Sequence, residues 1–182
     1  MKTQIEIENT IQECIHLILP NFDRTKIRPS YQNDADMGEN LYRLSDDTKT
    51  IGPLTCHDNF IYYFVSFNTD TQQTVNVTAE GQVDITRSMQ VLIDIYGDDC
   101  QSLALILMSV IKSPFILNYL SQNGLYLINQ NVTAKQINEI INEEWWVRQQ
   151  LSFDLAENVT IDMSQYELNE YAEEAPYEVI IK

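Results

Sequence analysis

The stretch Arg87-Ser88-Met89-Gln90-Val91-Leu92-Ile93-Asp94-Ile95-Tyr96, followed by Gly97-Asp98-Asp99, decides the fold. Apolar residues recur at every second position from Met89 to Ile95, which predicts a β-strand with one apolar side. Gly97-Asp98-Asp99 then indicates a turn, and residues 100–111 have helical spacing with Asp98 or Asp99 as N-cap. Since apolar residues occur almost all round this helix, it is expected to lie centrally, nearly surrounded by other elements.

The remaining segments alternate between helical and extended patterns. A face of Ile7, Ile11 and Ile15 predicts an N-terminal helix over residues 3–19. The other predicted helices are 113–121 and a small one at 133–142. The other predicted strands are 26–31, 59–69, 125–129, 145–156 and 158–163. This order predicts an α+β fold: a mainly antiparallel, mixed sheet packed against a long central helix and the N-terminal helix.

One domain accounts for residues 1–163, because 182 residues are too few for two domains of ordinary size. Alternating valines around Glu80-Gly81 predict an extended hairpin arm at about 70–86. Residues 32–58 lack periodicity and are interpreted as a long loop. Residues 164–182 form an acidic C-terminal segment, and 177–181 have the pattern of an edge strand.

The charge balance is strongly acidic, with 11 Lys and Arg against 27 Asp and Glu and a formal net charge of −16. Nucleic-acid phosphate and anionic lipid are bound by clustered basic residues, so both are disfavoured as partners. An apolar share of 44% argues against disorder for most of the chain. The longest apolar run, residues 103–111, is half of a membrane span, and no signal-peptide pattern begins the chain. A soluble protein of cytosolic type, without membrane partner, is expected.

No catalytic, cofactor-binding or metal-binding residues are predicted. Nucleotide-binding glycine motifs, zinc-protease motifs and the hydrolase serine motif do not occur. The adjacent Cys56 and His57 would point to different centres, and the odd cysteine count argues against a disulfide framework. The cluster Asp34, Asp36 and Glu39 lacks the spacing of a calcium loop. A magnesium site at Asp94, Asp98 and Asp99 remains an alternative to simple helix capping.

Aromatic side chains give the predicted strands two adhesive faces. The residues concerned are Tyr62, Tyr63, Tyr96, Trp145 and Trp146. Tyrosine and tryptophan are enriched in interface cores, although burial under the domain's own loops and arm is an equal alternative. Trp145 and Val147 are expected to face inward and Trp146 outward. Arg148 is expected to pair with Asp94 across the strands or to bridge to a second subunit. The candidate subunit-interface residues are Tyr62, Tyr63, Val75, Val77, Trp146 and Arg148.

The strand Val91-Leu92-Ile93-Asp94-Ile95-Tyr96-Gly97-Asp98-Asp99 with its following helix resembles the tail-terminator and neck proteins of tailed bacteriophages. The late strand Trp145-Trp146-Val147-Arg148-Gln149-Gln150-Leu151-Ser152-Phe153-Asp154-Leu155 is similar to a strand of the neck-terminator family. The resemblance covers residues 3–163 and rests on these two segments and the order of elements.

The resemblance implies a non-enzymatic virion structural protein that forms a ring, usually a homohexamer. The ring caps the tail tube and joins it to the head or connector. It is assembled in the host cytoplasm and located in the virion neck. It implies no cofactor, and DNA is only a passing polymer. The candidates for an acidic lumen are Glu167, Glu170, Glu173 and Glu174. The alternative is an acidic DNA mimic that inhibits a nucleic-acid-binding enzyme.

Overall fold

The computed structural model describes residues 2–30, 45–46, 49–50, 55–67, 75–77, 82–141 and 143–162, and it has the predicted α+β fold. The helices are α1 (Gln4–Ile18), α2 (Cys100–Val110) and α3 (Pro114–Gln122), with a short 3-10 helix η1 (Arg24–Lys26). The strands are β1 (Ile27–Pro29), β2 (Ser45–Asp46), β3 (Lys49–Thr50), β4 (Phe60–Phe67), β5 (Val75–Val77), β6 (Gln82–Tyr96), β7 (Leu125–Ile141) and β8 (Glu144–Asp162).

The main sheet has the strand order β1-β4-β6-β8-β7, with β5 also paired to β6. β1 and β4 are parallel and the other neighbours are antiparallel, which agrees with the predicted mainly antiparallel, mixed sheet. The small antiparallel pair β2–β3 lies within the predicted long loop, most of which is outside the described residues. Register places Tyr63, Ile93 and Leu151 in one cross-strand row, and all three are buried.

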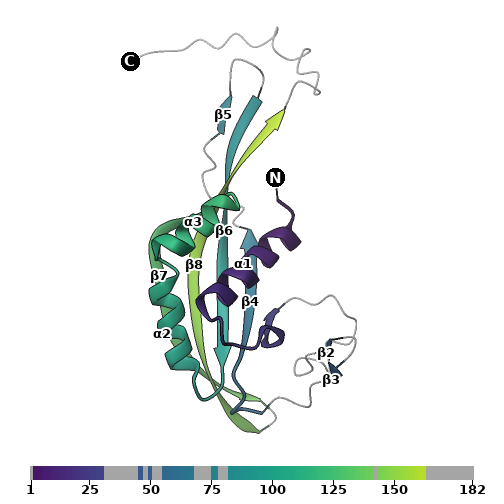
Figure 1. Ribbon diagram of the computed structural model, residues 1–182, viewed down its shortest axis with the longest axis vertical. Coiled ribbons are helices and arrows are strands. Elements are labelled where there is room, and N and C mark those ends of the chain that lie inside the picture. The colour runs from purple at the N-terminus through teal and green to yellow at the C-terminus, as the bar shows by residue number, and fades with distance from the viewer. Residues whose placement is uncertain are drawn as a thin grey trace, which may run out of the picture.

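The three helices cover one face of the sheet (Figure 1). α1 buries Ile7, Ile11 and Ile15 against it, and each such side chain contributes about 1.5–3 kcal/mol by leaving water. A capping box begins α1: the Thr3 hydroxyl accepts from the Glu6 amide, and the Glu6 carboxylate accepts from the Thr3 amide at 2.7 Å. These bonds also hold the pKa of Glu6 below its usual value.

The predicted helix at 133–142 is wrong, because residues 133–141 belong to the long strand β7. Its register with β8 shifts between Ile128 and Thr133 and then continues to Ile141. Ile137 and Ile141 are four residues apart, a spacing that keeps two side chains on one face in either a helix or a strand. The two predicted strands, at 145–156 and 158–163, are one continuous strand, β8, as far as Asp162.

α2 is neither long nor central. It has 11 residues against 15 in α1, and it lies beside the other helices on the sheet. Other elements do not surround α2 as predicted, because Leu105 is 59% exposed and Ile106 is 43% exposed.

The turn into α2 is also stabilised differently from the prediction. Asp99 is the N-cap, but its side chain makes no capping bond and instead accepts from the Asn59 amide group at 2.8 Å. The Asn59 side-chain oxygen in turn accepts from the Asp99 backbone amide. Gly97 has φ +98°, and a Cβ there would lie 2.5 Å from the carbonyl oxygen of Asp58. Glycine is therefore required at this close approach of two loops.

The predicted hairpin arm is present as three strands instead of two. We define the arm as β5 together with residues 82–86 of β6 and 158–162 of β8. β5 pairs with β6 in the predicted hairpin, and β8 adds the third strand. β6 begins at Gln82 rather than at Arg87, so body and arm share one continuous strand. The arm projects beyond the three helices (Figure 1).

Candidate assembly surfaces

The arm has an aliphatic face that continues the core face of the sheet. Odd-numbered residues of β6 face the helices in the body, and the same alternation runs into the arm. There Ile85 lies opposite Val159 and Val83 opposite Ile161. Backbone register also aligns Val75 with Ile85 and Val77 with Val83. Val159 is buried in the protomer, whereas Val83, Ile85 and Ile161 are half-buried, and these three make the face a candidate assembly surface.

The opposite face of the arm is polar and internally hydrogen-bonded. The Thr160 hydroxyl donates to the Asp84 carboxylate at 2.6 Å, and the Thr86 hydroxyl donates to the Asn158 side-chain oxygen at 3.1 Å. Cross-strand polar pairs of this kind favour one register of an otherwise exposed ribbon. The arm is therefore amphipathic, with one face adapted to water.

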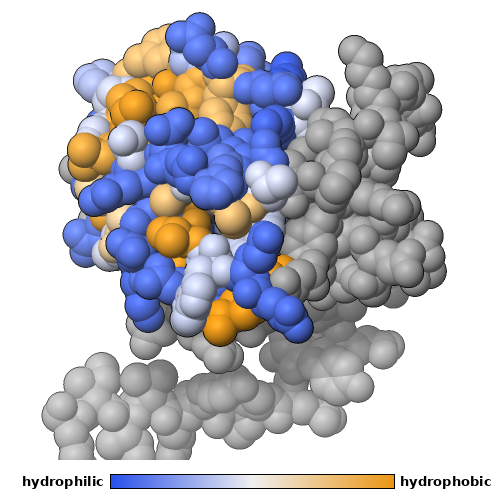
Figure 2. All heavy atoms as spheres, turned by 90° about the horizontal axis from the view of Figure 1, so that it is seen from below, coloured by the Kyte–Doolittle hydropathy of each residue, from blue (hydrophilic) through white to orange (hydrophobic). Residues whose placement is uncertain are grey.

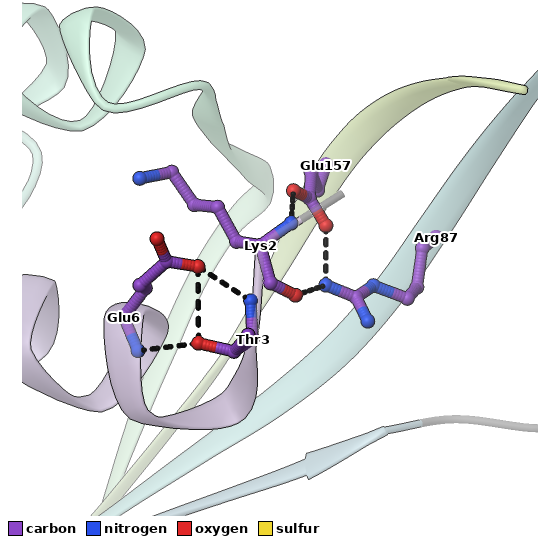
Figure 3. Close-up of polar contacts among 5 residues, drawn as sticks. All are labelled: Lys2, Thr3, Glu6, Arg87 and Glu157. Carbon is purple, nitrogen blue, oxygen red and sulfur yellow. Dashed lines mark hydrogen bonds and ion pairs between the residues drawn. The ribbon is translucent and has the colours of Figure 1, made fainter.

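An ion pair separates the arm from the core. Arg87 and Glu157 lie opposite each other on the core face, between the buried pair of Met89 and Leu155 and the arm residues. Glu157 is only 4% exposed, and it also accepts from the backbone amide of Lys2 at 2.7 Å. The Arg87 guanidinium donates to the Lys2 carbonyl at 2.9 Å (Figure 3). We call these three residues the junction, because they join the start of α1 to the base of the arm.

A second cluster lies on the sheet face opposite the helices, near the end of the sheet farthest from the arm. Phe60 and Tyr96 stack with ring centroids 4.5 Å apart, and Trp146 meets both rings edge-on. Tyr62 packs against the cluster and is half-buried. The cluster gives this face a small core of its own, as the predicted two-faced strands require.

Arg148 is held inside the protomer by the charged residues around this cluster. It lies 3.6 Å from the Asp94 carboxylate and 3.9 Å from that of Glu139, and it donates to the Tyr96 hydroxyl at 3.0 Å. Tyr96 in turn donates to Glu139 at 2.9 Å. Burial raises the pKa of Asp94, while Arg148 and a bond from Gln150 act in the opposite direction. The predicted pair between Arg148 and Asp94 is confirmed.

Exposed apolar side chains lie on the helix side of the sheet at the end of β7 and β8 away from the arm. Trp145 is 66% exposed, its cross-strand partner Ile140 is 60% exposed and Val147 is 40% exposed. Trp145 and Val147 were predicted to face inward, and they do lie on the same side of β8 as the core residues. At this end of the strand, however, that side is exposed to solvent. Figure 2 shows this end of the molecule, where separate hydrophobic patches lie between hydrophilic residues. We call Ile140, Trp145 and Val147 the terminal patch.

The six predicted interface residues occupy different environments, and their role at an interface stays a prediction. Tyr63 is 2% exposed in the main core, Trp146 is 4% exposed in the aromatic cluster, and neither is presented at the protomer surface. Val75 and Val77 lie in the arm. Trp145 was among the aromatic residues predicted to be adhesive, but its patch with Ile140 and Val147 was not predicted, because their exposure depends on where the helix layer ends.

The candidate catalytic and metal-binding residues do not converge. The Asp98 carboxylate contacts His57 Nδ1 at 2.9 Å, whereas Asp94 faces Arg148. Among the described residues, no group of three His, Cys, Asp or Glu side chains is placed to hold a metal ion. Cys14 and Cys100 are buried thiols. The cluster at Asp34, Asp36 and Glu39 and the four lumen candidates from Glu167 to Glu174 lie outside the described residues.

The α+β domain thus has a projecting amphipathic arm at one end and a separate apolar patch at the other. The family model described as phage neck terminator protein matches residues 45–181, and the chain belongs to this family. It is thus a structural protein of the phage tail or neck, which places it in the virion and in contact with other head or tail proteins. No curated protein sequence matches the chain significantly.

No single helix in the described ranges is long and apolar enough to cross a membrane. α2 and α3 meet the length and composition criteria only together, as a pair bent by 73°.

Proposed function

We propose that copies of this chain assemble into a ring, a homohexamer, that caps the phage tail tube and joins it to the head or connector. The observation that carries the proposal is the aliphatic face of the arm, which extends beyond the helix layer of its own protomer. Family membership supports the neck location, and the ring is the arrangement that the resemblance implies.

The two ends of β8 supply different surfaces, as a ring requires. Head-to-tail contacts join two unlike patches on each subunit, whereas a two-fold dimer uses one patch twice. Ile161 belongs to the arm and Trp145 to the terminal patch, and about 50 Å of extended strand separates them at about 3.3 Å per residue. In the proposed ring, the aliphatic arm face of one protomer contacts its neighbour. Val75 and Val77 belong to β5, which pairs with β6 in this arm.

The aromatic cluster lies at the end of the sheet farthest from the arm, where it stabilises the strands that carry the terminal patch. Tyr62 is its half-buried member, while Trp146 and Arg148 fix the neighbouring strands. Tyr63 acts from the main core. In this proposal these residues shape the surface, and the arm supplies most of the contact.

The acidic charge suits a channel that DNA traverses without binding. Like-charge repulsion acts over about 8 Å at physiological salt, which is enough to keep phosphate from the wall of a narrow pore. The proposed lining consists of Glu167, Glu170, Glu173 and Glu174. The ring needs no catalytic residue, cofactor or metal.

Light scattering after size exclusion and negative-stain microscopy test the ring with a matched pair of arm variants. Ile85→Asp adds a charge to the aliphatic face, and Thr86→Asp adds the same charge to the polar face one residue away. Rings and tail-tube binding are expected to be lost in the first variant and kept in the second, with circular dichroism confirming that both fold. A wild-type protein that stays monomeric at all concentrations and does not bind tail tubes contradicts the proposal.

The DNA-mimic alternative gains no support from the family match. It predicts tight binding of a nucleic-acid-binding enzyme in competition with DNA, and the same purified protein can be tested for that competition.

A further inference from the structure

The outer edge of β4 is paired over only part of its length. β1 pairs with residues 61–63 and ends at Pro29, and the Ser30 amide then donates to the Tyr63 carbonyl at 2.8 Å. Because backbone groups of alternate residues point to the same edge of a sheet, those of Val65 and Phe67 point outward in the same direction. Within the described ranges, no strand pairs with this edge beyond Tyr63.

A groove runs along this part of the edge. It has a volume of about 750 Å³ and is lined by Thr3, Gln4, Ile5 and Glu8 of α1 and by Phe64, Val65, Ser66 and Phe67 of β4. Ile5 is 69% exposed there, the most exposed large apolar side chain of those described. The groove thus combines outward-pointing backbone groups of a strand with an exposed apolar side chain. These are the two features that recognise an added β-strand: its backbone pairs with the edge, and its alternate side chains enter the groove.

We propose that this chain's own C-terminal segment, Tyr177-Glu178-Val179-Ile180-Ile181, adds to the outer edge of β4 as a further strand. The segment is rich in β-branched and aromatic residues, which favour strands. Tyr177, Val179 and Ile181 share one side of such a strand. That side faces Ile5 in the groove.

The connection is long enough within one molecule. Phe67 pairs with Met89, which lies opposite Leu155, so the groove begins at the row of Leu155. From the row of Asp162 to that row the sheet extends about 23 Å, and from β8 to a strand outside β4 about 14 Å, using about 3.3 Å per residue and about 4.8 Å per strand. The near end of the groove is therefore about 27 Å from the end of β8. Residues 163–176 span up to about 46 Å when extended, so they reach it without strain.

Two further observations favour this occupant. The family match continues to residue 181, so the segment belongs to the part of the chain that defines the family. An open strand edge also invites pairing with other chains, and proteins commonly cover such edges. The inference concerns each single copy and does not rest on ring formation.

Amide hydrogen exchange measured by NMR tests the proposal, comparing the full chain with a chain ending at residue 176. Protection of the Val65 and Phe67 amides is expected to fall at least about tenfold in the shortened chain, since the added strand supplies their acceptors. Protection of Val91, which is paired on both sides, stays unchanged and shows that the shortened chain is folded. A synthetic peptide of residues 175–182, added in excess to the shortened chain, is expected to restore the protection of the Val65 and Phe67 amides.

A second variant distinguishes backbone pairing of the C-terminal segment from simple apolar contact with the groove. Val179→Pro removes a backbone donor and is expected to reproduce the loss, whereas Lys182→Pro, just beyond the strand, is expected to leave protection intact. Unchanged protection at Val65 and Phe67 in the shortened chain overturns the proposal. So does protection that returns when isotope-labelled shortened chain is mixed with an equal amount of unlabelled full chain, because that result assigns the groove to a second copy.

Discussion

Replacement of Arg87 by methionine is expected to be among the most destabilising single changes outside the main core. The substitution keeps an unbranched apolar stem of similar length but removes the guanidinium. Glu157 then remains as a carboxylate whose side chain is 6% exposed, with the Lys2 amide as its remaining partner at the junction. The Lys2 carbonyl loses its donor at 2.9 Å, and Phe67 loses a cation 4.5 Å above its ring.

The size of the effect follows from the burial of Glu157. Removing one partner of a buried ion pair costs about 3–5 kcal/mol, and the partial exposure of Arg87 favours the lower end of that range. A loss of about 3 kcal/mol corresponds to a fall in Tm of about 6–12 °C for a domain of this size. Replacing both partners, as Arg87→Met with Glu157→Leu, leaves no buried charge and is expected to cost less than Arg87→Met alone.

Urea denaturation followed by circular dichroism measures these free energies, with an unchanged m-value showing that the unfolded state is comparable. Arg24→Met is the matched control, because Arg24 pairs with Glu13 at the surface, where both side chains are more than a third exposed. Its expected cost is below about 1 kcal/mol. If Arg87→Met costs no more than Arg24→Met, or if the double variant is less stable than the single one, the reasoning about a buried charge is wrong.

Three further predictions concern the turn near α2 and the thiols. Gly97→Ala is expected to cost more than about 2 kcal/mol in urea denaturation, because φ of +98° and the Asp58 carbonyl both oppose a Cβ; a neutral result would contradict the tight approach. The hydrogen bond and charge of Asp98 raise the pKa of His57, so Asp98→Asn should lower it in an NMR titration. The pair stabilises the folded state at low pH and loses this effect as the pH rises through the raised pKa. Iodoacetamide should label the half-buried Cys56 before Cys14, whose thiol pKa burial raises to about 12, and mass spectrometry of the digest reads the order.

The central part of the fold was predictable because its signal is local. In β6 the alternation of Val91, Ile93 and Ile95 allows only one period, and a strand with that period buries one side. The same reasoning identified α1 from its isoleucine face. The pair between Arg148 and Asp94 also followed, once the two strands were assumed to be neighbours.

The predictions were wrong where contacts between elements distant in the sequence determine the local structure or the exposure of a residue. Residues 133–142 have a spacing that fits either period, and pairing with the long strand β8 makes residues 133–141 a strand. The alternation of Trp145 and Trp146 was predicted correctly, but exposure depends on how far the helices reach along the sheet. At Asp99 the local capping rule fails because Asn59, forty residues earlier, binds the same side chain. The junction could not be predicted, since it joins Lys2, Arg87 and Glu157 from three distant parts of the chain.

The continuity of β6 and β8 has a mechanical consequence. Every residue of β6, from Gln82 in the arm to Tyr96 at the far end of the body, pairs with β8. A pull on the arm along its axis therefore acts parallel to the strands, and it loads the whole ladder of hydrogen bonds in shear instead of opening them one by one. The arm cannot swivel about a flexible linker, because the strands that build it also form the centre of the sheet. Tension applied at the tip of the arm is therefore carried along β6 and β8 into the centre of the sheet.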